Sequence, residues 1–296
     1  MKAGLLTALL VVLCVSTPAA ETYEIDGWAV GTVGFGWTGF GAALAGPGEY
    51  LINPAGLGNA EQTEIIGTYV PEYEDRLTPC FGASFIKPMR TESASLGEER
   101  TSGTLAVSLF NVAQEQEHDG RLEGNSLAVI SFGSRASELV SYGVNLKVLS
   151  VENDGRADSG FGLDLGVQLY PGDFRFGLAV SNVIPPGISL AAERTFAERT
   201  VRLGAGYSLY GIFNIAAELE YATSAARLDY GLYAELIPLK LEVLRLALGG
   251  GWRIEENIWG GFVSLRLGFF EAAGAAQLDE GGFTVFSFKL AFSPDF

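Results

Sequence analysis

From about residue 64 to residue 292, apolar residues alternate with small or polar ones along the chain, and turn-forming sequences interrupt the alternation at intervals. A period of two residues is typical of β-strands, because successive side chains point to opposite faces. In the clearest segment one face carries Phe161, Leu163, Leu165, Val167 and Leu169. The opposite face carries Gly162, Asp164, Gly166 and Gln168. The pattern predicts a long series of antiparallel strands.

We expect about fourteen strands, with about 17 residues for each strand and its turn, and a tilted membrane-spanning strand needs about 9–11. The expected strands cover residues 64–77, 79–89, 103–116, 126–135, 139–153, 159–170, 174–184, 200–209, 213–222, 227–236, 241–254, 257–269, 272–278 and 283–292. The charged stretch 90–100 is interpreted as a solvated loop. The sequence from Val183 to Gly187 breaks the alternation and is expected to open a longer loop that extends to Glu198.

The apolar faces are unbroken, which suits contact with lipid, whereas the second faces are rich in Gly, Arg and Asp, which suits a crowded, wet interior. A soluble β-sandwich has the same period and is the alternative. The frequent glycine and charge on the second face favour an all-β fold, an antiparallel transmembrane β-barrel. By parity, its interior face carries Asn145, Lys147, Asp164, Arg175, Arg202, Glu218, Glu220, Asp229, Glu235, Arg245 and Arg266.

These residues form a predicted lumen lining with two interpretations. Arg or Lys facing lipid at mid-depth would cost ~2–4 kcal/mol each, so the charges belong inside. They either pair with one another and make a narrow lumen rigid, or they determine what passes or binds. No pair is spaced to suggest a specific ligand, which favours the first interpretation.

The first 62 residues lack sustained alternation. Residues 1–20 are typical of a secretory signal peptide, with Lys2, an apolar run and small residues at the cleavage site. Residues 21–62 are expected to form a packed hatch segment, and residues 63–296 the barrel. Asn53-Pro54 favours a turn, and Gly56 and Gly58 are expected to allow a tight reversal through positive φ.

Asn53, Pro54, Ala55, Gly56 and Leu57 follow a run of glycine, alanine and aromatic residues, and this junction motif resembles the PorV/PorQ group of outer-membrane proteins, which are relatives of the FadL channel. The resemblance continues in residues 142–147, 160–166 and 176–182. It implies a hatch at the mouth of a barrel in the bacterial outer membrane. Ala45-Gly46 stand where that group usually has an acidic pair.

The amino-acid composition argues against several classes of function. The formal charge of −16 argues against a nucleic-acid surface. The single histidine, His118, lies in an acidic stretch and is interpreted as a surface residue, so neither a histidine-based metal site nor an enzyme is expected. Gly34-Phe35-Gly36-Trp37-Thr38-Gly39 matches a dinucleotide fingerprint, but a signal peptide precedes it and no βαβ pattern surrounds it. No cofactor is expected.

The resemblance implies two functions. The barrel binds or passes hydrophobic small molecules, or it is an accessory barrel that works with secretion-machinery proteins. A structural barrel that anchors an envelope assembly is the alternative, and outer-membrane lipid is the expected surrounding in each case.

Overall fold

The fold is that of a computed structural model. It describes residues 22–23, 41–44, 49–70, 80–92, 99–115, 122–153, 156–190, 193–223, 226–241, 243–255, 257–278 and 284–294. The predicted signal peptide, the fingerprint at residues 34–39, Ala45-Gly46 and His118 lie outside these ranges. Among the described residues, no helix is long and apolar enough to cross a lipid bilayer.

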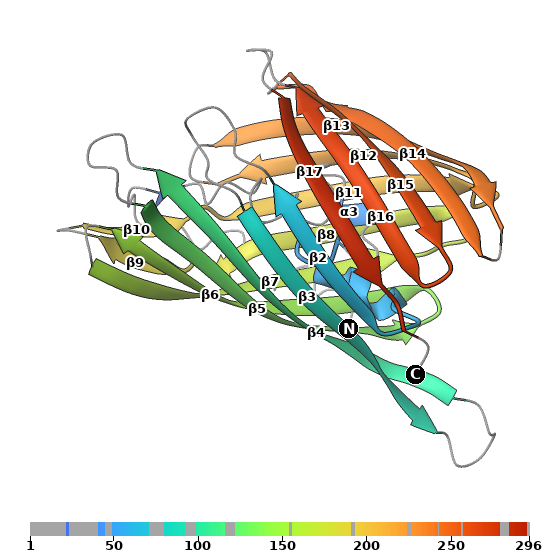
Figure 1. Cartoon of the computed structure of the whole chain (residues 1–296), viewed down its shortest axis with the longest axis horizontal. Coiled ribbons are helices and arrows are strands. Elements are labelled where there is room, and N and C mark those ends of the chain that lie inside the picture. Colours follow the sequence, from blue (N-terminus) through green and yellow to red (C-terminus); the bar gives the residue numbers. More distant parts are fainter. Residues whose placement is uncertain are drawn as a thin grey trace, which may run out of the picture.

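Fourteen antiparallel strands form a closed barrel, in which β17 pairs with β2 and β11 pairs with β8 (Figure 1). The first seven are β2 (Glu64–Val70), β3 (Cys80–Glu92), β4 (Glu99–Glu115), β5 (Leu122–Ser137), β6 (Val140–Asn153), β7 (Arg156–Leu169) and β8 (Phe174–Ile184). The others are β11 (Thr200–Leu209), β12 (Phe213–Ala222), β13 (Arg227–Lys240), β14 (Leu244–Arg253), β15 (Ile258–Leu267), β16 (Phe270–Leu278) and β17 (Thr284–Phe292). The predicted fold class is confirmed.

The predicted bounds of β8, β11 and β12 match the structure, and most others differ by a few residues at one end. The expected loop over residues 90–100 is wrong at its two ends, and residues 93–98 lie outside the described ranges. Antiparallel pairing of β3 with β4 continues through Thr91 with Arg100 and Glu92 with Glu99, so this hairpin projects beyond the neighbouring strands at one end of the barrel (Figure 1). The charges of this stretch suit a solvated hairpin as well as a solvated loop.

The expected loop over residues 185–198 is also wrong. Here β9 (Gly187–Leu190) and β10 (Glu193–Ala197) form a three-stranded sheet with β1 (Thr22–Tyr23), and β1 is parallel to β10. Pro186 directly precedes β9, is fully buried and packs against Gly162 of β7. Pro185 and Pro186 have no backbone N–H to donate, so the pairing of β8 ends before them. They do not prevent the next residues from starting a new sheet.

Among the described residues before β2 there are two short helices. They are α3 (Gly41–Leu44) and the 3₁₀ helix η3 (Pro54–Asn59). Asn53 caps η3, because its side-chain oxygen accepts a hydrogen bond from the Ala55 N–H at 3.1 Å. The predicted turn at Asn53-Pro54 is therefore a helix start. The expected positive φ at Gly56 and Gly58 is wrong: neither is among the positive-φ glycines.

The two faces of the barrel differ as the alternation predicts. On β7 the outward side chain of Phe161 is 73% exposed, whereas the inward carboxylate of Asp164 is 2% exposed. The large exposed hydrophobic side chains of the other strands have the same outward parity as Phe161. Part of the inward face is buried against the segment that contains α3 and η3.

Candidate functional site

The interior of the barrel holds residues 41–44 and 49–60, which we call the hatch segment. Helix η3 packs mainly against β5, β6 and β7, and α3 against β8 and β11. Glycines on these strands make the close approach possible. A Cβ atom at Gly177 would overlap the carbonyl of Ala42, and one at Gly143 would overlap the carbonyl of Pro54.

Side chains of the wall and of the hatch segment converge on Ala42. The carboxylate of Glu218 on β12 accepts a hydrogen bond from the Ala42 N–H at 2.9 Å. The amides of Asn53 and Gln168 donate to the Ala42 carbonyl at 2.7 and 3.3 Å. A four-residue helix leaves its terminal N–H and C=O groups without intrahelical partners, and these contacts satisfy two of them.

Tyr50 anchors the other part of the hatch segment. Its hydroxyl group is hydrogen-bonded to the hydroxyl of Ser108, which donates to Ser84 at 2.7 Å, and its carbonyl accepts from Asn145 at 3.1 Å. Burial raises the pKa of Tyr50 above its ordinary value of 10.0, although these hydroxyl contacts oppose the rise. An apolar cluster around Tyr50 completes the anchor and contains Leu57, Ala60, Ile66, Ile86, Ala106 and Ala291.

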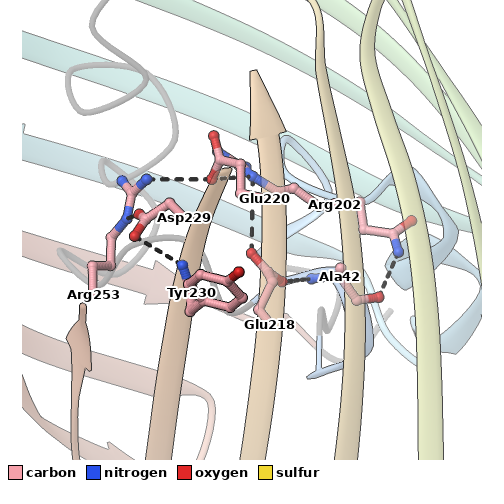
Figure 2. Close-up of polar contacts among 8 residues, drawn as sticks. Ala42, Arg202, Glu218, Glu220, Asp229, Tyr230 and Arg253 are labelled. Atoms are coloured by element: carbon pink, nitrogen blue, oxygen red, sulfur yellow. Dashed lines mark hydrogen bonds and ion pairs between the residues drawn. The ribbon is translucent and has the colours of Figure 1, made fainter. Parts of the chain in front are cut away.

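A charged network lies on the inner face of β11–β14 (Figure 2). Arg202 pairs with Glu220 at 2.9 Å and with Glu218 at 3.8 Å. Arg253 pairs with Asp229 at 2.6 Å and with Glu220 at 3.5 Å. Two guanidinium groups thus face three carboxylates, and Glu218 connects this network to Ala42 of the hatch segment.

A second polar group lies on β6, β7 and β8. Asp164 pairs with Lys147 at 2.6 Å and accepts hydrogen bonds from the Asn145 side chain at 3.2 Å and the Asn182 N–H at 2.7 Å. Asn182 has φ +55 and lies where β8 shifts its register against β7. Its side chain accepts from Lys147 at 2.5 Å. The irregularity in β8 therefore has its polar groups satisfied.

All of the predicted lining residues have inward parity, but the structure brings only some together. Arg202, Glu218, Glu220 and Asp229 share one network, and Asn145, Lys147 and Asp164 share the other. Glu235 and Arg245 form a separate pair at 3.8 Å. Arg266 donates to the Gly268 carbonyl at 3.2 Å, and Arg175 is half-buried on β8, apart from both networks. These pairings fit a rigid interior, while a role in selection stays a prediction.

The predicted lining residues omitted Arg253, Gln168 and Asn182. The sequence places Gln168 on the same face as Asp164, and Arg253 continues the parity of Arg245, so parity alone indicates both. Parity could not identify Asn182, because this residue lies at the register shift of β8 against β7, and that shift depends on how the two strands pair in the folded barrel.

One inward-facing patch is apolar. Ile237, Ala247, Phe262 and Ala275, on β13–β16, are buried together, and Tyr233 packs on them with its ring stacked on Phe262 at 6.4 Å. We call these five residues the apolar wall patch. It is separate from the apolar cluster around Tyr50. In the described ranges, no three His, Cys, Asp or Glu side chains are grouped so that they could hold a metal ion.

Residues 112–219 match the family model described as F plasmid transfer operon, TraF, protein. This match covers little more than a third of the chain. No curated protein sequence matches the chain significantly.

Solved structures with the same fold include outer-membrane channels. The toluene transporter TodX of Pseudomonas putida is 11% identical with a TM-score of 0.59, and the alignment covers 95% of this chain and 100% of TodX. A FadL homologue of Pseudomonas aeruginosa is 9% identical with a TM-score of 0.54, covering 93% and 99%. The toluene transporter TbuX of Ralstonia pickettii is 14% identical with a TM-score of 0.52, covering 92% and 97%. The chain therefore has the fold of FadL-like channels.

Proposed function

We propose that this protein is a bacterial outer-membrane channel that binds or passes hydrophobic small molecules. The observation that carries the proposal is the apolar wall patch, an inward-facing group of aliphatic and aromatic side chains on β13–β16 that lies apart from the apolar cluster around Tyr50. An aqueous pore for polar solutes has no need of such a group, whereas an apolar solute that reached it would gain about 25 cal/mol for each Å² of apolar surface that it buried.

The outer surface supports a membrane setting. Its exposed side chains are largely aliphatic and aromatic along the strands, and aromatic clusters lie at both ends. Trp252 and Trp259 stack at 4.8 Å at one end, and Phe269 and Phe270 contact at 4.8 Å at the other. Transmembrane barrels carry such aromatic girdles at the two interfaces.

The lengths of the connections between strands support an orientation of the barrel in the membrane. Five of the six connections at the end that holds Phe269 have only two to four residues, and the chain also ends there after β17. The opposite end carries the longer connections and the sheet β1–β10–β9. Short turns are periplasmic in bacterial outer-membrane barrels, so the end with Phe269 faces the periplasm. We also propose that residues 1–20 are a signal peptide and that residues 21–62 are the hatch.

The substrate class is inferred from the channels with this fold, since TodX and TbuX are toluene transporters. The membership in the PorV/PorQ group and the accessory role in secretion stay predictions from sequence resemblance. The structural role, an anchor for an envelope assembly, also stays a prediction.

The test begins with purification in mild detergent and mass spectrometry of the molecules that co-purify. Bound apolar small molecules, together with faster uptake of radiolabelled toluene by cells that carry the barrel in their outer membrane, are the expected result. A host that carries the empty vector gives the background rate. Uptake equal to background, combined with a co-purified secreted polypeptide, would replace the channel by the secretion role. Uptake at background with neither type of molecule bound would favour the anchor.

A further inference from the structure

The end of the barrel that holds Phe269 carries large apolar side chains in the turns that join β11 to β12, β13 to β14 and β15 to β16. We call these residues the apolar rim, and they are Tyr210, Ile212, Leu241, Val243, Phe269 and Phe270. Their exposed fractions run from 46% at Ile212 to 86% at Tyr210. Single apolar side chains on a surface are ordinary. Three successive turns that share them form a larger exposed apolar surface, which is typical of an interaction site.

The turns on the other side of the same end are more polar. The β5–β6 turn places the exposed Glu138 beside Leu139, and the β7–β8 turn contains the exposed Asp173. The guanidinium of Arg135 lies over the ring of Tyr170, next to these turns. The β3–β4 hairpin, which is nearly opposite the β13–β14 turn in the barrel, extends further still (Figure 1). Apolar turns are therefore a property of one side of this end, not of the whole end.

Main-chain groups of the apolar rim are hydrogen-bonded to the neighbouring strands. The N–H of Ile237 donates to the Ile212 carbonyl at 2.7 Å. The N–H of Gly268 donates to the Val243 carbonyl, also at 2.7 Å. Lipid offers the backbone no hydrogen-bond partner, so a turn that enters it needs these groups satisfied within the protein. The rim meets this requirement where each of these turns lies against the next strand.

The apolar rim continues the outward surface of the barrel without a polar border. Leu209 and Phe213 flank the β11–β12 turn, lie directly opposite each other and are exposed with outward parity. Leu267 stands in the same way directly opposite Phe270 beside the β15–β16 turn. The surface that contacts hydrocarbon along the strands therefore extends onto the turns. This continuity favours lipid as the partner of the rim over a separate protein.

A lysine lies among the apolar turns. Lys240 is exposed, and its Nζ reaches the β11–β12 turn, where a Cβ atom at Gly211 would lie 3.3 Å from it. Long cationic side chains bury their methylene groups in apolar surroundings and place their charge at the level of the lipid headgroups. Tyrosine is enriched at the same level. Lys240 and Tyr210 therefore fit the phosphate region of a phospholipid leaflet.

We propose that the apolar rim is a lipid-binding surface that lies in the phospholipid interface of the inner leaflet, while the β5–β6 and β7–β8 turns remain in water. The inference rests on the proposed membrane setting and orientation, and it assigns a partner to one side of the periplasmic end. Burial of the rim removes apolar surface from water, so the barrel is drawn more deeply into the bilayer on its β11–β16 side. The resulting tilt moves the β3–β4 hairpin away from the membrane.

Spin labels on single cysteines measure the depth of the two sides. In a chain with Cys80→Ser, a label is attached at Val243→Cys (apolar rim), Asp173→Cys (β7–β8 turn) or Leu165→Cys (outward on β7), and the protein is placed in vesicles of phosphatidylethanolamine and phosphatidylglycerol. Collisions with oxygen, which dissolves in lipid, are compared with collisions with a polar nickel chelate. We expect the oxygen-to-nickel ratio at Val243→Cys to be several-fold higher than at Asp173→Cys and to approach that of Leu165→Cys.

The three labels separate the possible failures. Equal ratios at Val243→Cys and Asp173→Cys, together with a high ratio at Leu165→Cys, would overturn the lipid-binding rim and leave the membrane setting intact. The rim would then be a surface for a protein partner. A ratio at Leu165→Cys as low as that of Asp173→Cys would reject the membrane setting itself, and the rim with it.

A matched pair of charge substitutions tests whether the rim acts as a unit. Leu241→Asp lies in the apolar rim and Leu139→Asp in the β5–β6 turn, and the two leucines are similarly exposed, at 59% and 57%. A label at Ile212→Cys reports on the neighbouring turn of the rim. Leu241→Asp should lower the oxygen-to-nickel ratio of this label several-fold, whereas Leu139→Asp should leave it unchanged. Equal effects of the two substitutions, in variants that keep the heat-modifiable band, would overturn the proposal.

Discussion

The carboxylate of Glu218 accepts a hydrogen bond from the main-chain N–H of Ala42 at 2.9 Å, although 176 positions separate the two residues. The same carboxylate lies 3.8 Å from the guanidinium of Arg202. One side chain thus joins the hatch segment, the barrel wall and the charged network of β11–β14. Loss of this side chain should therefore affect the hatch segment more than the barrel.

Replacement of Glu218 by alanine should loosen α3. The N–H of Ala42 would be left buried without its acceptor, which costs about 1–3 kcal/mol. Limited proteolysis in detergent should then cleave the chain near residues 41–44, while the boiled and unboiled gel bands stay distinct. Glu218→Gln keeps an acceptor oxygen and serves as the control. Equal resistance of the alanine variant and the unchanged protein would contradict the anchor.

Glycines under the hatch segment should tolerate no side chain. Gly177→Ala would push its methyl group into the Ala42 carbonyl, so we expect α3 to leave its seat and the barrel to unfold at a lower denaturant concentration. The control is Gly67→Ala on β2, where nothing lies within 4 Å of the added Cβ atom. That change should be neutral, or stabilising by about 0.4–1 kcal/mol through the unfolded chain. Equal midpoints for the two variants would argue against close packing at Gly177.

The ionisation of Tyr50 should make the free energy of unfolding depend on pH under alkaline conditions. Because burial raises the pKa of Tyr50, its contribution is fully present below the ordinary value of 10.0 and is lost as pH rises through the higher pKa of the folded state. Tyr50→Phe removes this dependence and the hydrogen bond to Ser108, at a cost of about 1 kcal/mol near neutral pH. The difference in unfolding free energy between the two proteins should shrink above pH 10. A constant difference up to pH 12 would contradict a buried, neutral tyrosine.

Arg253 should be more important for stability than an exposed cation. Arg253→Met leaves Asp229, which is 3% exposed, without its guanidinium partner, and breaking a buried pair in this way costs about 3–5 kcal/mol. Unfolding in detergent measures this loss. Arg253→Met/Asp229→Leu removes both charges and should recover much of it. The exposed Lys240→Met on the same sheet is the control, and a loss at Arg253 no larger than at Lys240 would show that the pair contributes little.

The barrel could be predicted because its alternation is a local property of the chain. Outward Phe161 and inward Asp164 fall on opposite faces in any antiparallel barrel, and the strand bounds follow from where the alternation stops. The parity of Arg202 and Glu220 placed both inside. Their contact depends on the register of β11 against β12, which sets them directly opposite each other.

The sequence was less informative wherever residues distant along the chain decide the local structure. The pairing of β1 with β10 joins Thr22 to Phe196 and has no signal in either segment alone. Gly56 was expected to adopt positive φ, whereas close packing of η3 against β5 and β6 explains the small residues of this region better. The apolar wall patch was missed for a similar reason: Tyr233 and Phe262 have inward parity but come together only when β13, β14 and β15 are in register.

The hatch segment also constrains the order in which the polypeptide is assembled. Leu57 and Ala60 pack in one cluster with Ile66 on β2 and Ala291 on β17, the two strands whose pairing closes the cylinder. Glu218 and Gln168, which hold Ala42, are translated more than a hundred residues after it. Complete seating of the hatch segment therefore requires both the middle strands and the β17–β2 seam. The hatch segment in this way ties the last seam of the cylinder to its middle.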